Sequence, residues 1–198
     1  MNEIEASKQV EYEPLSIREL LRRIKNLSSL ILDLAYFAYL NENKEISDLV
    51  MELEKKIDHL VYLLYINASL LARDKEDAKL SAAIIKIGSA LNEFANAAAD
   101  IANLIRIGIT PHRYVKKAFE RTEEVVDDTR VEVGSDIIGR ALRDLEKLGF
   151  YVDVIALKRN NRWIIYPNSK IKLSAGDILI VRGSKDIVEE FKKVCAFG

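Results

Sequence analysis

The stretch that decides the fold lies near the C-terminus and consists of four short segments. They read Val131-Glu132-Val133-Gly134-Ser135-Asp136-Ile137-Ile138-Gly139-Arg140-Ala141-Leu142, Tyr151-Val152-Asp153-Val154-Ile155-Ala156-Leu157-Lys158-Arg159, Arg162-Trp163-Ile164-Ile165-Tyr166-Pro167 and Ser174-Ala175-Gly176-Asp177-Ile178-Leu179-Ile180-Val181. Alternation at 130–133 and near-continuous β-formers in the later segments predict short strands. Ser135 or Asp136 is expected to cap a short helix ending at Gly149. A final helix over 184–194 completes a β-α-β-β-β-α unit over residues 130–198.

The residues before this stretch have helical spacing. Ser16 is expected to cap a first helix, with Glu19 as its capping-box partner. A second helix follows after Asn41 to Lys44, and a third begins near Asp77 and stops at Gly108 and Pro111. The sequence therefore predicts an α+β protein of two domains, with an N-terminal antiparallel helical bundle over 16–110. We expect a flexible N-terminus at 1–15 and a connector over 111–129, helical from about 112 to 128.

The composition is that of a globular protein with a core. The 198 residues are 49% hydrophobic and 31% charged, and the net charge is −1. Residues 1–110 hold 13 Lys and Arg against 17 Asp and Glu (−4), and residues 111–198 hold 17 against 14 (+3). This asymmetry is too mild to predict a nucleic-acid partner. High Lys and Glu usage points to a thermophilic source.

Several functional classes have no support in the sequence. The opening residues lack a signal peptide, and the apolar runs are too short to insert into a bilayer, so we expect a cytoplasmic protein. The glycines form neither a dinucleotide-binding fingerprint nor a phosphate-binding loop. Two histidines and the single Cys195 assemble no catalytic triad. The chain is therefore not expected to be an enzyme.

The four opening segments, in their order and spacing, resemble the TrkA-C domain, which is the C-terminal half of the RCK regulators of potassium channels and transporters. The resemblance implies a module that dimerises and binds small regulatory ligands, among them cyclic di-adenosine monophosphate. The nucleotide-binding half that usually precedes TrkA-C is missing here. As ligand contacts we expect Arg143 and Lys147, whose charges suit a phosphate, and Asp153 at a strand start; a charged rim without ligand is the alternative. Trp163 and Tyr166 could form a dimer strip or belong to the core.

Residues 16–109 resemble a PhoU-like helical bundle. The resemblance rests on Glu54-Lys55-Lys56-Ile57-Asp58 and Leu91-Asn92-Glu93-Phe94-Ala95-Asn96. PhoU proteins carry acidic pairs in both places, and some bind iron or zinc there. Spacing of four places Glu54 and Asp58 on one helix face, as a divalent metal site needs, but the matching positions in the third helix are Asn92 and Asn96. A solvated acidic stripe is the alternative.

Together these observations predict a regulatory or accessory protein of potassium or other cation transport. A homodimer would sense a small ligand, such as a cyclic dinucleotide, through TrkA-C, and the bundle would act on a membrane channel or transporter subunit. Two other functions stay open. One is a PhoU-type, metal-binding regulator of phosphate uptake, and the other is a structural assembly module without a ligand.

Overall fold

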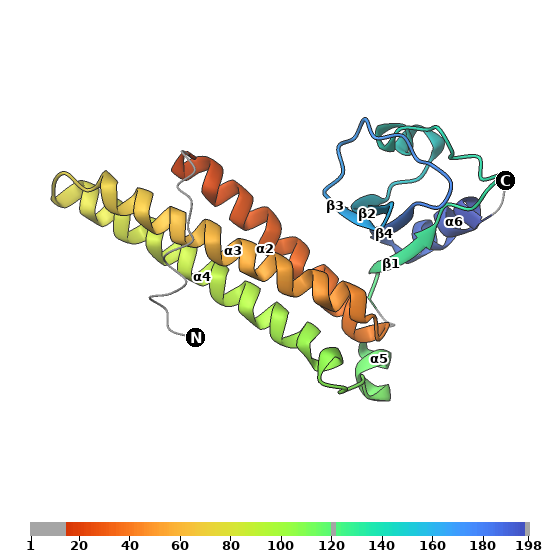
Figure 1. The fold of residues 1–198 in the computed structure, drawn as a ribbon, viewed down its shortest axis with the longest axis horizontal. Helices are drawn as coiled ribbons and strands as arrows, with labels where there is room; N and C mark the ends of the chain where they lie inside the picture. Colours follow the sequence, from red (N-terminus) through yellow and green to blue (C-terminus); the bar gives the residue numbers. More distant parts are fainter. Residues whose placement is uncertain (1–14, 120–121, 197–198) are drawn as a thin grey trace. The chain divides into compact units, whose positions relative to one another are not determined.

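A computed structural model of the chain describes residues 15–119 and 122–196. They belong to two compact units, Met1–Pro111 and His112–Gly198, which are drawn in Figure 1. The terminus expected to be flexible lies, apart from Leu15, outside the described residues. Within the described ranges, no helix is long and apolar enough to cross a membrane.

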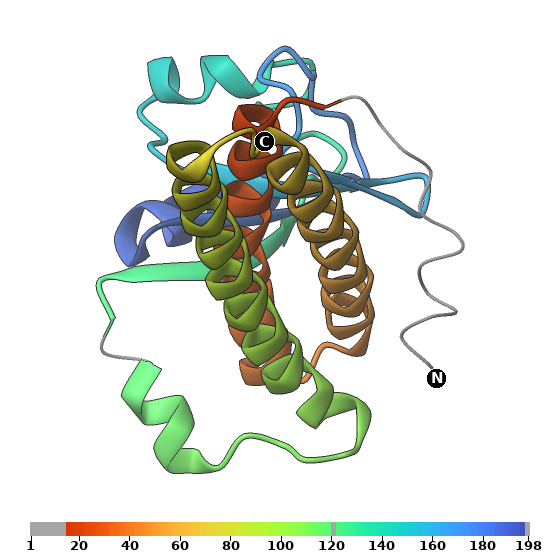
Figure 2. The ribbon, with the colours of Figure 1, turned by 90° about the vertical axis from the view of Figure 1, so that its left-hand side faces the viewer.

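The first unit is the expected three-helix bundle. Its helices are α2 (Ile17–Leu40), α3 (Lys44–Leu71) and α4 (Lys75–Arg106), and each packs against the other two. Figure 2 shows the three helices side by side around a common interior. The connections between them are short, which makes consecutive helices antiparallel.

Side-chain caps begin each helix of the bundle. The Ser16 side chain accepts a hydrogen bond from the backbone N–H of Glu19 at 3.2 Å, as predicted. The Glu19 carboxylate does not complete the expected capping box, because it binds Arg22 and Arg23 at 2.7 Å. Asn43 and Asp74 cap α3 and α4 in the same way as Ser16. These caps satisfy backbone donors that have no partner within the helix.

Small residues let the three helices approach closely. The buried face of α4 consists mainly of Ser, Gly and Ala. A Cβ atom on Gly88 would lie 2.8 Å from Leu64 Cδ2, so only glycine fits there without a shift of the leucine. Buried hydroxyls are satisfied across the helix contacts: Ser47 Oγ donates to the carbonyl of Ala102 at 2.7 Å, and Ser81 Oγ to that of Ala68 at 2.6 Å.

The second unit combines one antiparallel sheet with helical segments. Its elements are α5 (Arg113–Phe119), β1 (Glu124–Arg130), the 3₁₀ helices η2 (Leu142–Asp144) and η3 (Glu146–Leu148), β2 (Asp153–Arg159), β3 (Arg162–Ile165), β4 (Ile178–Ser184) and α6 (Lys185–Ala196). The strand order is β1-β4-β2-β3, and all neighbours pair antiparallel. Helix α6 packs against β1 and β4. The α+β class and the two-part organisation are confirmed.

The prediction of a helix from about 112 to 128 is wrong over most of that range. Helix α5 ends at Phe119, and residues 124–130 form strand β1 instead. The two β-branched residues Val125 and Val126 pair with Gly183 and Arg182 of β4. This pairing supplies a full set of ladder hydrogen bonds, which outweighs the weak helical spacing of the segment. The first strand accordingly ends at Arg130, which is the first of the four alternating residues that predicted it.

The prediction of a single helix between Ser135 and Gly149 is also wrong. Turns and the two 3₁₀ helices occupy this segment. Gly139 has φ +80°, in the left-handed region that no right-handed helix contains. Its N–H donates to the carbonyl of Leu173 at 2.8 Å, and the N–H of Leu173 donates to the carbonyl of Arg140 at 2.9 Å. The segment therefore bonds to a distant part of the chain rather than to itself.

A hydrophobic core and one buried ion pair hold the second unit together. Residues 131–149, called the 3₁₀ segment below, contribute to the core together with the sheet, α6 and one residue of the loop before β4. The core consists of Val131, Ile137, Leu145, Val154, Leu157, Leu173, Leu179, Val181, Val188, Phe191 and Cys195. Asp177, only 1% exposed, accepts from Arg159 Nε at 2.8 Å and from Arg159 Nη2 at 2.6 Å. The predicted hairpin turn at Asn160 and Asn161 is confirmed, with φ of 50° and 61°.

Candidate functional site

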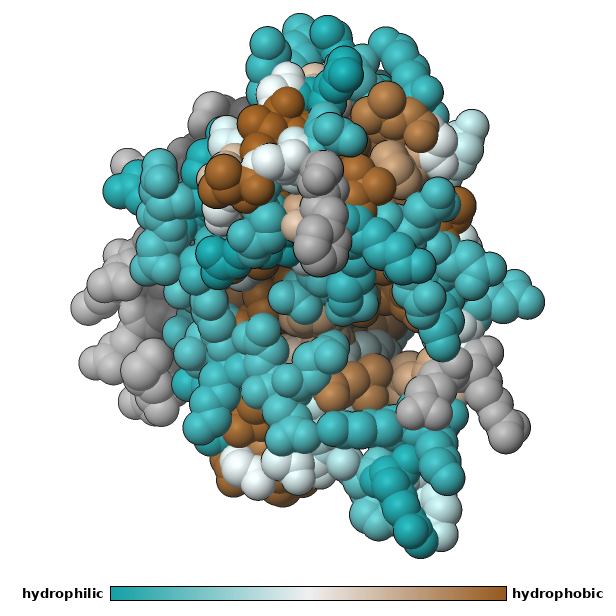
Figure 3. Space-filling view, turned by 90° about the vertical axis from the view of Figure 1, so that its right-hand side faces the viewer, coloured by the Kyte–Doolittle hydropathy of each residue, from teal (hydrophilic) through white to brown (hydrophobic). Residues whose placement is uncertain are grey.

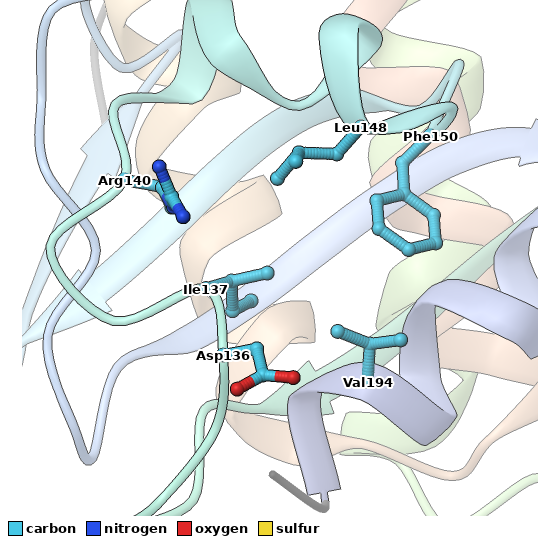
Figure 4. Close-up of a pocket in the computed structure, with 6 residues that line it drawn as sticks. All are labelled: Asp136, Ile137, Arg140, Leu148, Phe150 and Val194. Atoms are coloured by element: carbon cyan, nitrogen blue, oxygen red, sulfur yellow. The ribbon is translucent and has the colours of Figure 1, made fainter.

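A cavity of about 370 Å³ opens in the second unit, beside the start of the 3₁₀ segment. Its lining residues are Asp136, Ile137, Arg140, Leu148, Phe150 and Val194. Figure 4 shows Leu148 and Phe150 facing Asp136, Ile137 and Val194 across the space, with Arg140 at its edge. The cavity thus combines apolar walls with one acidic and one basic side chain.

Long-range hydrogen bonds position the charged side chains of this cavity. The bond between Gly139 and Leu173 fixes the turn from which Arg140 projects, and an isolated bridge between Ala141 and Lys172 continues it. On the other side, Ser135 Oγ donates to the carbonyl of Val194 at 2.6 Å. This bond ties the residue before Asp136 to α6. Asp136 and Arg140 are therefore carried by a segment held at both ends.

Aromatic packing forms the apolar wall. Phe150 meets the buried Phe191 of α6 edge to face, with ring centroids 5.4 Å apart. Gly149, with φ +92°, ends η3 and turns the chain so that Phe150 returns to the core. Leu148 stays exposed at the end of η3. The wall thus has one part, Phe150, that is packed against α6 and one part, Leu148 of η3, that is exposed.

The two charges at the cavity are exposed and available to a ligand. Asp136 and Arg140 are both exposed. Within residues 15–119 and 122–196, the side chain of neither is engaged in a hydrogen bond or ion pair with another described residue. A guanidinium binds phosphate or carboxylate through paired donors, and a carboxylate accepts from amino or hydroxyl groups. The arrangement suits a small ligand that carries an anionic group and an apolar or aromatic part.

The structure places the three expected ligand residues near this cavity in sequence but not in its lining. Arg143 is exposed on η2, and its backbone N–H donates to the carbonyl of Ser169 at 2.9 Å. Lys147 forms an exposed ion pair with Asp144 at 2.8 Å, and that lysine lowers the pKa of Asp144. Asp153, at the start of β2, pairs with Arg182 of β4 at 2.8 Å. A ligand role for these three residues stays a prediction.

Sequence reasoning missed Asp136 and Arg140 as lining residues. Both stand in the opening stretch, where they served as landmarks of the fold. The signal that could have found them is Gly139, since a glycine with positive φ beside an arginine indicates a turn rather than a helix. In a turn, the arginine projects to a different side from the one that helical spacing predicts.

The acidic pair of the bundle gains a third carboxylate in the structure. Glu54 of α3 is half-buried and forms a hydrogen bond with Asp58, and Asp100 of α4 also acts on it. Burial first, and then the negative charge of Asp58, raise the pKa of Glu54 to about 7. In the part of the chain that the structure describes, no group of three or more His, Cys, Asp or Glu residues is arranged to hold a metal ion. The expected metal role of Glu54 and Asp58 stays a prediction.

Trp163 and Tyr166, expected either at a dimer contact or in the core, lie on and just after β3, one of the two edge strands of the sheet. Trp163 is partly buried, and Lys158 lies over its ring at 5.8 Å from the centroid. Ile164 and Tyr166 are exposed. Figure 3 shows one face of the molecule, where hydrophobic patches lie among predominantly hydrophilic residues. The strip is thus peripheral to the hydrophobic core, and its role in a dimer stays a prediction.

Comparison with protein families assigns both units. The PhoU domain family matches residues 21–105, which cover the three helices of the bundle. The TrkA-C domain family matches residues 129–196, which cover the 3₁₀ segment, the sheet from β2 onward and α6. The chain carries a PhoU domain followed by a TrkA-C domain. The PhoU–TrkA-C chain therefore combines two domain types that are regulatory, and typically not catalytic.

Solved structures similar to the PhoU–TrkA-C chain include three that match different extents of it. The RCK C domain of the potassium transport protein KtrA, solved with cyclic di-AMP, is 30% identical and covers 40% of this chain and 89% of its own, with a TM-score of 0.32. The GsuK RCK domain is 16% identical and covers 56% and 24%, with a TM-score of 0.32. BusR of S. agalactiae, solved with its busAB promoter DNA, is 11% identical and covers 87% and 95%, with a TM-score of 0.34. No curated protein matches the chain.

Proposed function

We propose that this PhoU–TrkA-C protein regulates potassium or other cation transport by binding a small ligand in the cavity of its TrkA-C domain. The observation that carries the proposal is the guanidinium of Arg140, held at the edge of an apolar cavity beside Asp136. The protein acts in the cytoplasm as a homodimer, and its PhoU bundle contacts a membrane channel or transporter subunit. It catalyses no reaction.

The proposed ligand is an adenine nucleotide, with cyclic di-AMP as the first candidate. A cavity of about 370 Å³ lies in the usual size range of small-molecule sites, about 300–1,000 Å³. A phosphate would pair with Arg140, and an adenine ring would pack against Leu148 and Phe150. Asp136 would accept a hydrogen bond from an amino or hydroxyl group. A nucleotide provides all three kinds of partner in one molecule.

The proposed regulation is a shift between two arrangements of the dimer. The cavity joins the 3₁₀ segment to α6, because Asp136 and Arg140 come from the former and Val194 from the latter. Helix α6 packs against β1, the strand that follows α5 along the chain. A ligand that binds one arrangement more tightly increases its population, and β1 and α5 connect this change to the bundle.

Calorimetric titration of the full chain with cyclic di-AMP, AMP and ATP tests the ligand. Arg140→Ala should abolish binding or weaken it at least tenfold, because the phosphate loses a charged, bidentate donor. Arg143→Ala is the matched control, since it removes the same side chain three residues away, outside the cavity lining. If Arg143→Ala abolishes binding and Arg140→Ala does not, the ligand contacts the residues expected from the sequence instead.

Thermal unfolding provides a second measurement that does not depend on heats of binding. A ligand at one hundred times its dissociation constant stabilises the folded state by about 2.7 kcal/mol. The expected result is a higher melting temperature with one nucleotide of the panel and no change for Arg140→Ala. A flat response of the wild-type protein to the whole panel contradicts the proposal and favours an assembly module without a ligand.

The proposed partners do not include nucleic acid. The bundle carries a charge of −4 over residues 1–110 and the remainder +3, whereas DNA binding depends on several cationic contacts to phosphates. Electrophoretic mobility shift with a mixed-sequence duplex in 0.1 M salt checks this statement. A retarded complex at micromolar protein would contradict it and direct attention to a transcriptional role.

A metal-binding regulator of phosphate uptake is the second candidate, and the observation in its favour is the hydrogen-bonded carboxylate pair of Glu54 and Asp58 on one face of α3. Elemental analysis of the purified protein distinguishes the two candidates. Iron or zinc that co-purifies with the wild-type protein and is lost from Glu54→Ala would support the second one. Metal content equal to that of Glu54→Ala would remove it.

A further inference from the structure

Helix α4 carries an exposed apolar stripe along most of its length. The stripe, called the α4 stripe below, consists of Leu80, Ala83, Ile87, Ala90, Phe94 and Ala97. Its three large members are well exposed: Leu80 by 53%, Ile87 by 51% and Phe94 by 43%. The alanines between them are exposed as well. Large apolar side chains therefore project from α4 away from the interior of its own bundle.

The spacing of the α4 stripe is that of a coiled-coil seam. Its members follow one another at alternating intervals of three and four residues over 80–97. This repeat keeps one continuous apolar line on a helix and is the signature of packing against a second helix. The buried face of α4, on different residues, already contacts α2 and α3. Helix α4 thus has a second apolar face, against which a third helix can pack.

Four charged residues run beside the stripe at intervals of seven. They are Lys79, Lys86, Glu93 and Asp100, and all four are exposed. The two positive charges lie in the first half of the helix and the two negative charges in the second half. Lys79, Lys86 and Glu93 directly precede the three large residues of the stripe, and Asp100 occupies the same heptad position seven residues further on. Charges at this position of a heptad select the partner and its direction. Such a division favours a partner whose charges run in the opposite order.

A second copy of α4 in antiparallel orientation has this reversed order. With the two-fold axis between Ile87 and Ala90, Lys79 of one copy lies beside Asp100 of the second copy, and Lys86 lies beside Glu93 of the second copy. By symmetry the contact holds four pairs of opposite charge. Pairing of opposite charges across an interface sets direction and excludes wrong partners.

The sizes of the side chains match in the same register. Leu80 faces Ala97 of the second copy, and Phe94 faces Ala83. Ile87 faces Ala90. Each layer therefore combines one large and one small residue, as close packing at constant helix separation requires. A parallel pairing would place large on large and alanine on alanine, and would bring like charges to the same level.

We propose that two copies of the protein associate through the α4 stripe, with their α4 helices antiparallel and in this register. The contact spans residues 80–97, which is about 26 Å of helix. It belongs to the PhoU bundle and does not depend on a ligand in the TrkA-C domain. A contact between TrkA-C domains can therefore exist beside it.

Site-directed cross-linking of the full chain tests the register. Leu80→Cys and Ala97→Cys proteins should each fail to cross-link alone under mild oxidation, and should form a disulfide of twice the chain mass when mixed. Leu80→Cys alone forming that species would show a parallel contact, and no cross-link in either case would remove the contact; both outcomes overturn the proposal. The native Cys195 should not form cross-links of its own, because it is fully buried and burial raises the pKa of its thiol to about 11.

Charge reversal tests the same contact in solution. Lys86→Glu and Glu93→Lys should each weaken association about tenfold, since attraction becomes repulsion at two symmetric places, and the double swap should restore it. Lys56→Glu, an exposed position on α3, is the matched control. Sedimentation equilibrium provides the readout, and circular dichroism checks the fold. Single reversals that behave like the control overturn the proposal.

Hydrophobic disruption shows whether the stripe is covered by another part of the same chain. Ile87→Glu should shift the equilibrium to a smaller assembly without loss of helix content. If it lowers thermal stability but leaves the assembly size unchanged at every concentration, the stripe packs within one chain, and the proposal fails.

Discussion

The two domains keep their polar groups satisfied in different ways. In the PhoU bundle, single hydroxyls cross between helices, such as Ser47 to the carbonyl of Ala102 at 2.7 Å. In the TrkA-C domain, the buried carboxylate of Asp177 accepts from Nε and Nη2 of Arg159 at 2.8 and 2.6 Å, and from the backbone N–H of Ser174 at 2.8 Å. The bundle thus places its buried polar bonds at separate helix contacts. The TrkA-C domain gathers three of them on the single carboxylate of Asp177.

The largest effect is expected from Asp177→Ala, which should lower the free energy of unfolding of the TrkA-C domain by about 3 kcal/mol. The substitution removes the buried carboxylate that accepts from Arg159 and from the N–H of Ser174, and Arg159 keeps only its bond to the carbonyl of Lys172. Loss of the buried member of such a pair is costly. Urea denaturation with a probe in the sheet measures it. Lys147→Ala is the control, because it breaks an exposed pair with Asp144 and should change stability by about 0.5 kcal/mol or less. Equal losses in both variants would contradict the comparison.

Substitution of one glycine in each domain should have a smaller effect on stability and compares how well the two domains tolerate a new side chain. Gly139→Ala should cost about 1–2 kcal/mol, because an L-residue is strained at φ +80° although no atom obstructs its Cβ. Gly88→Ala should change stability by less than about 1 kcal/mol, since the helix gains propensity while Leu64 must move away from the new Cβ. Thermal unfolding of both variants measures the difference. A larger loss at Gly88 would show that the bundle is the less tolerant domain.

The smallest effect concerns pH and is confined to the bundle. The folded-state pKa of Glu54 is raised from 4.5 to about 7, so the folded protein holds this proton more tightly than the unfolded chain does. The stabilisation is complete below pH 4.5 and is lost as the pH rises through about 7. Glu54→Gln should therefore stabilise the bundle at pH 8 by about 1 kcal/mol, allowing for solvent screening, and have little effect at pH 4.5. The same substitution at the exposed Glu52 is the control; a pH-independent difference between the two would contradict the assignment.

The helices of the bundle were predictable because their signals are local. Ser16 begins α2 as its cap, and the apolar spacing that follows is repeated in α3 and α4. The hairpin at Asn160 and Asn161 was predictable for the same reason, since asparagine tolerates positive φ in a two-residue turn. Residues 124–149 were not, because β1 and the turn at Gly139 exist only through bonds to β4 and Leu173.

In the candidate site, too, local sequence and distant contacts decide different things about single side chains. The sequence predicted ligand contacts at Arg143, Lys147 and Asp153, and none of the three lines the cavity. The first two were expected on a helix, whereas the chain turns at Gly139 and Arg140 lies in the cavity lining. Asp153 is directed to Arg182 by the register of β2 and β4. Arg140 and Arg143, three residues apart, therefore lie on different sides of this segment, and only Arg140 lines the cavity.

The sequence by itself determined the α+β class, the bundle, the three later strands and the resemblance to PhoU and TrkA-C domains. These follow from residue type and spacing, which act over a few neighbouring positions. The tertiary structure alone decided that residues 124–130 pair with β4, that Arg140 lines the cavity, and that the large apolar residues of α4 face outward. The physical reason is that the direction of a side chain depends on which distant element its backbone bonds to or packs against. In α4, small residues allow α2 and α3 to approach on one side, and that contact leaves Leu80, Ile87 and Phe94 on another.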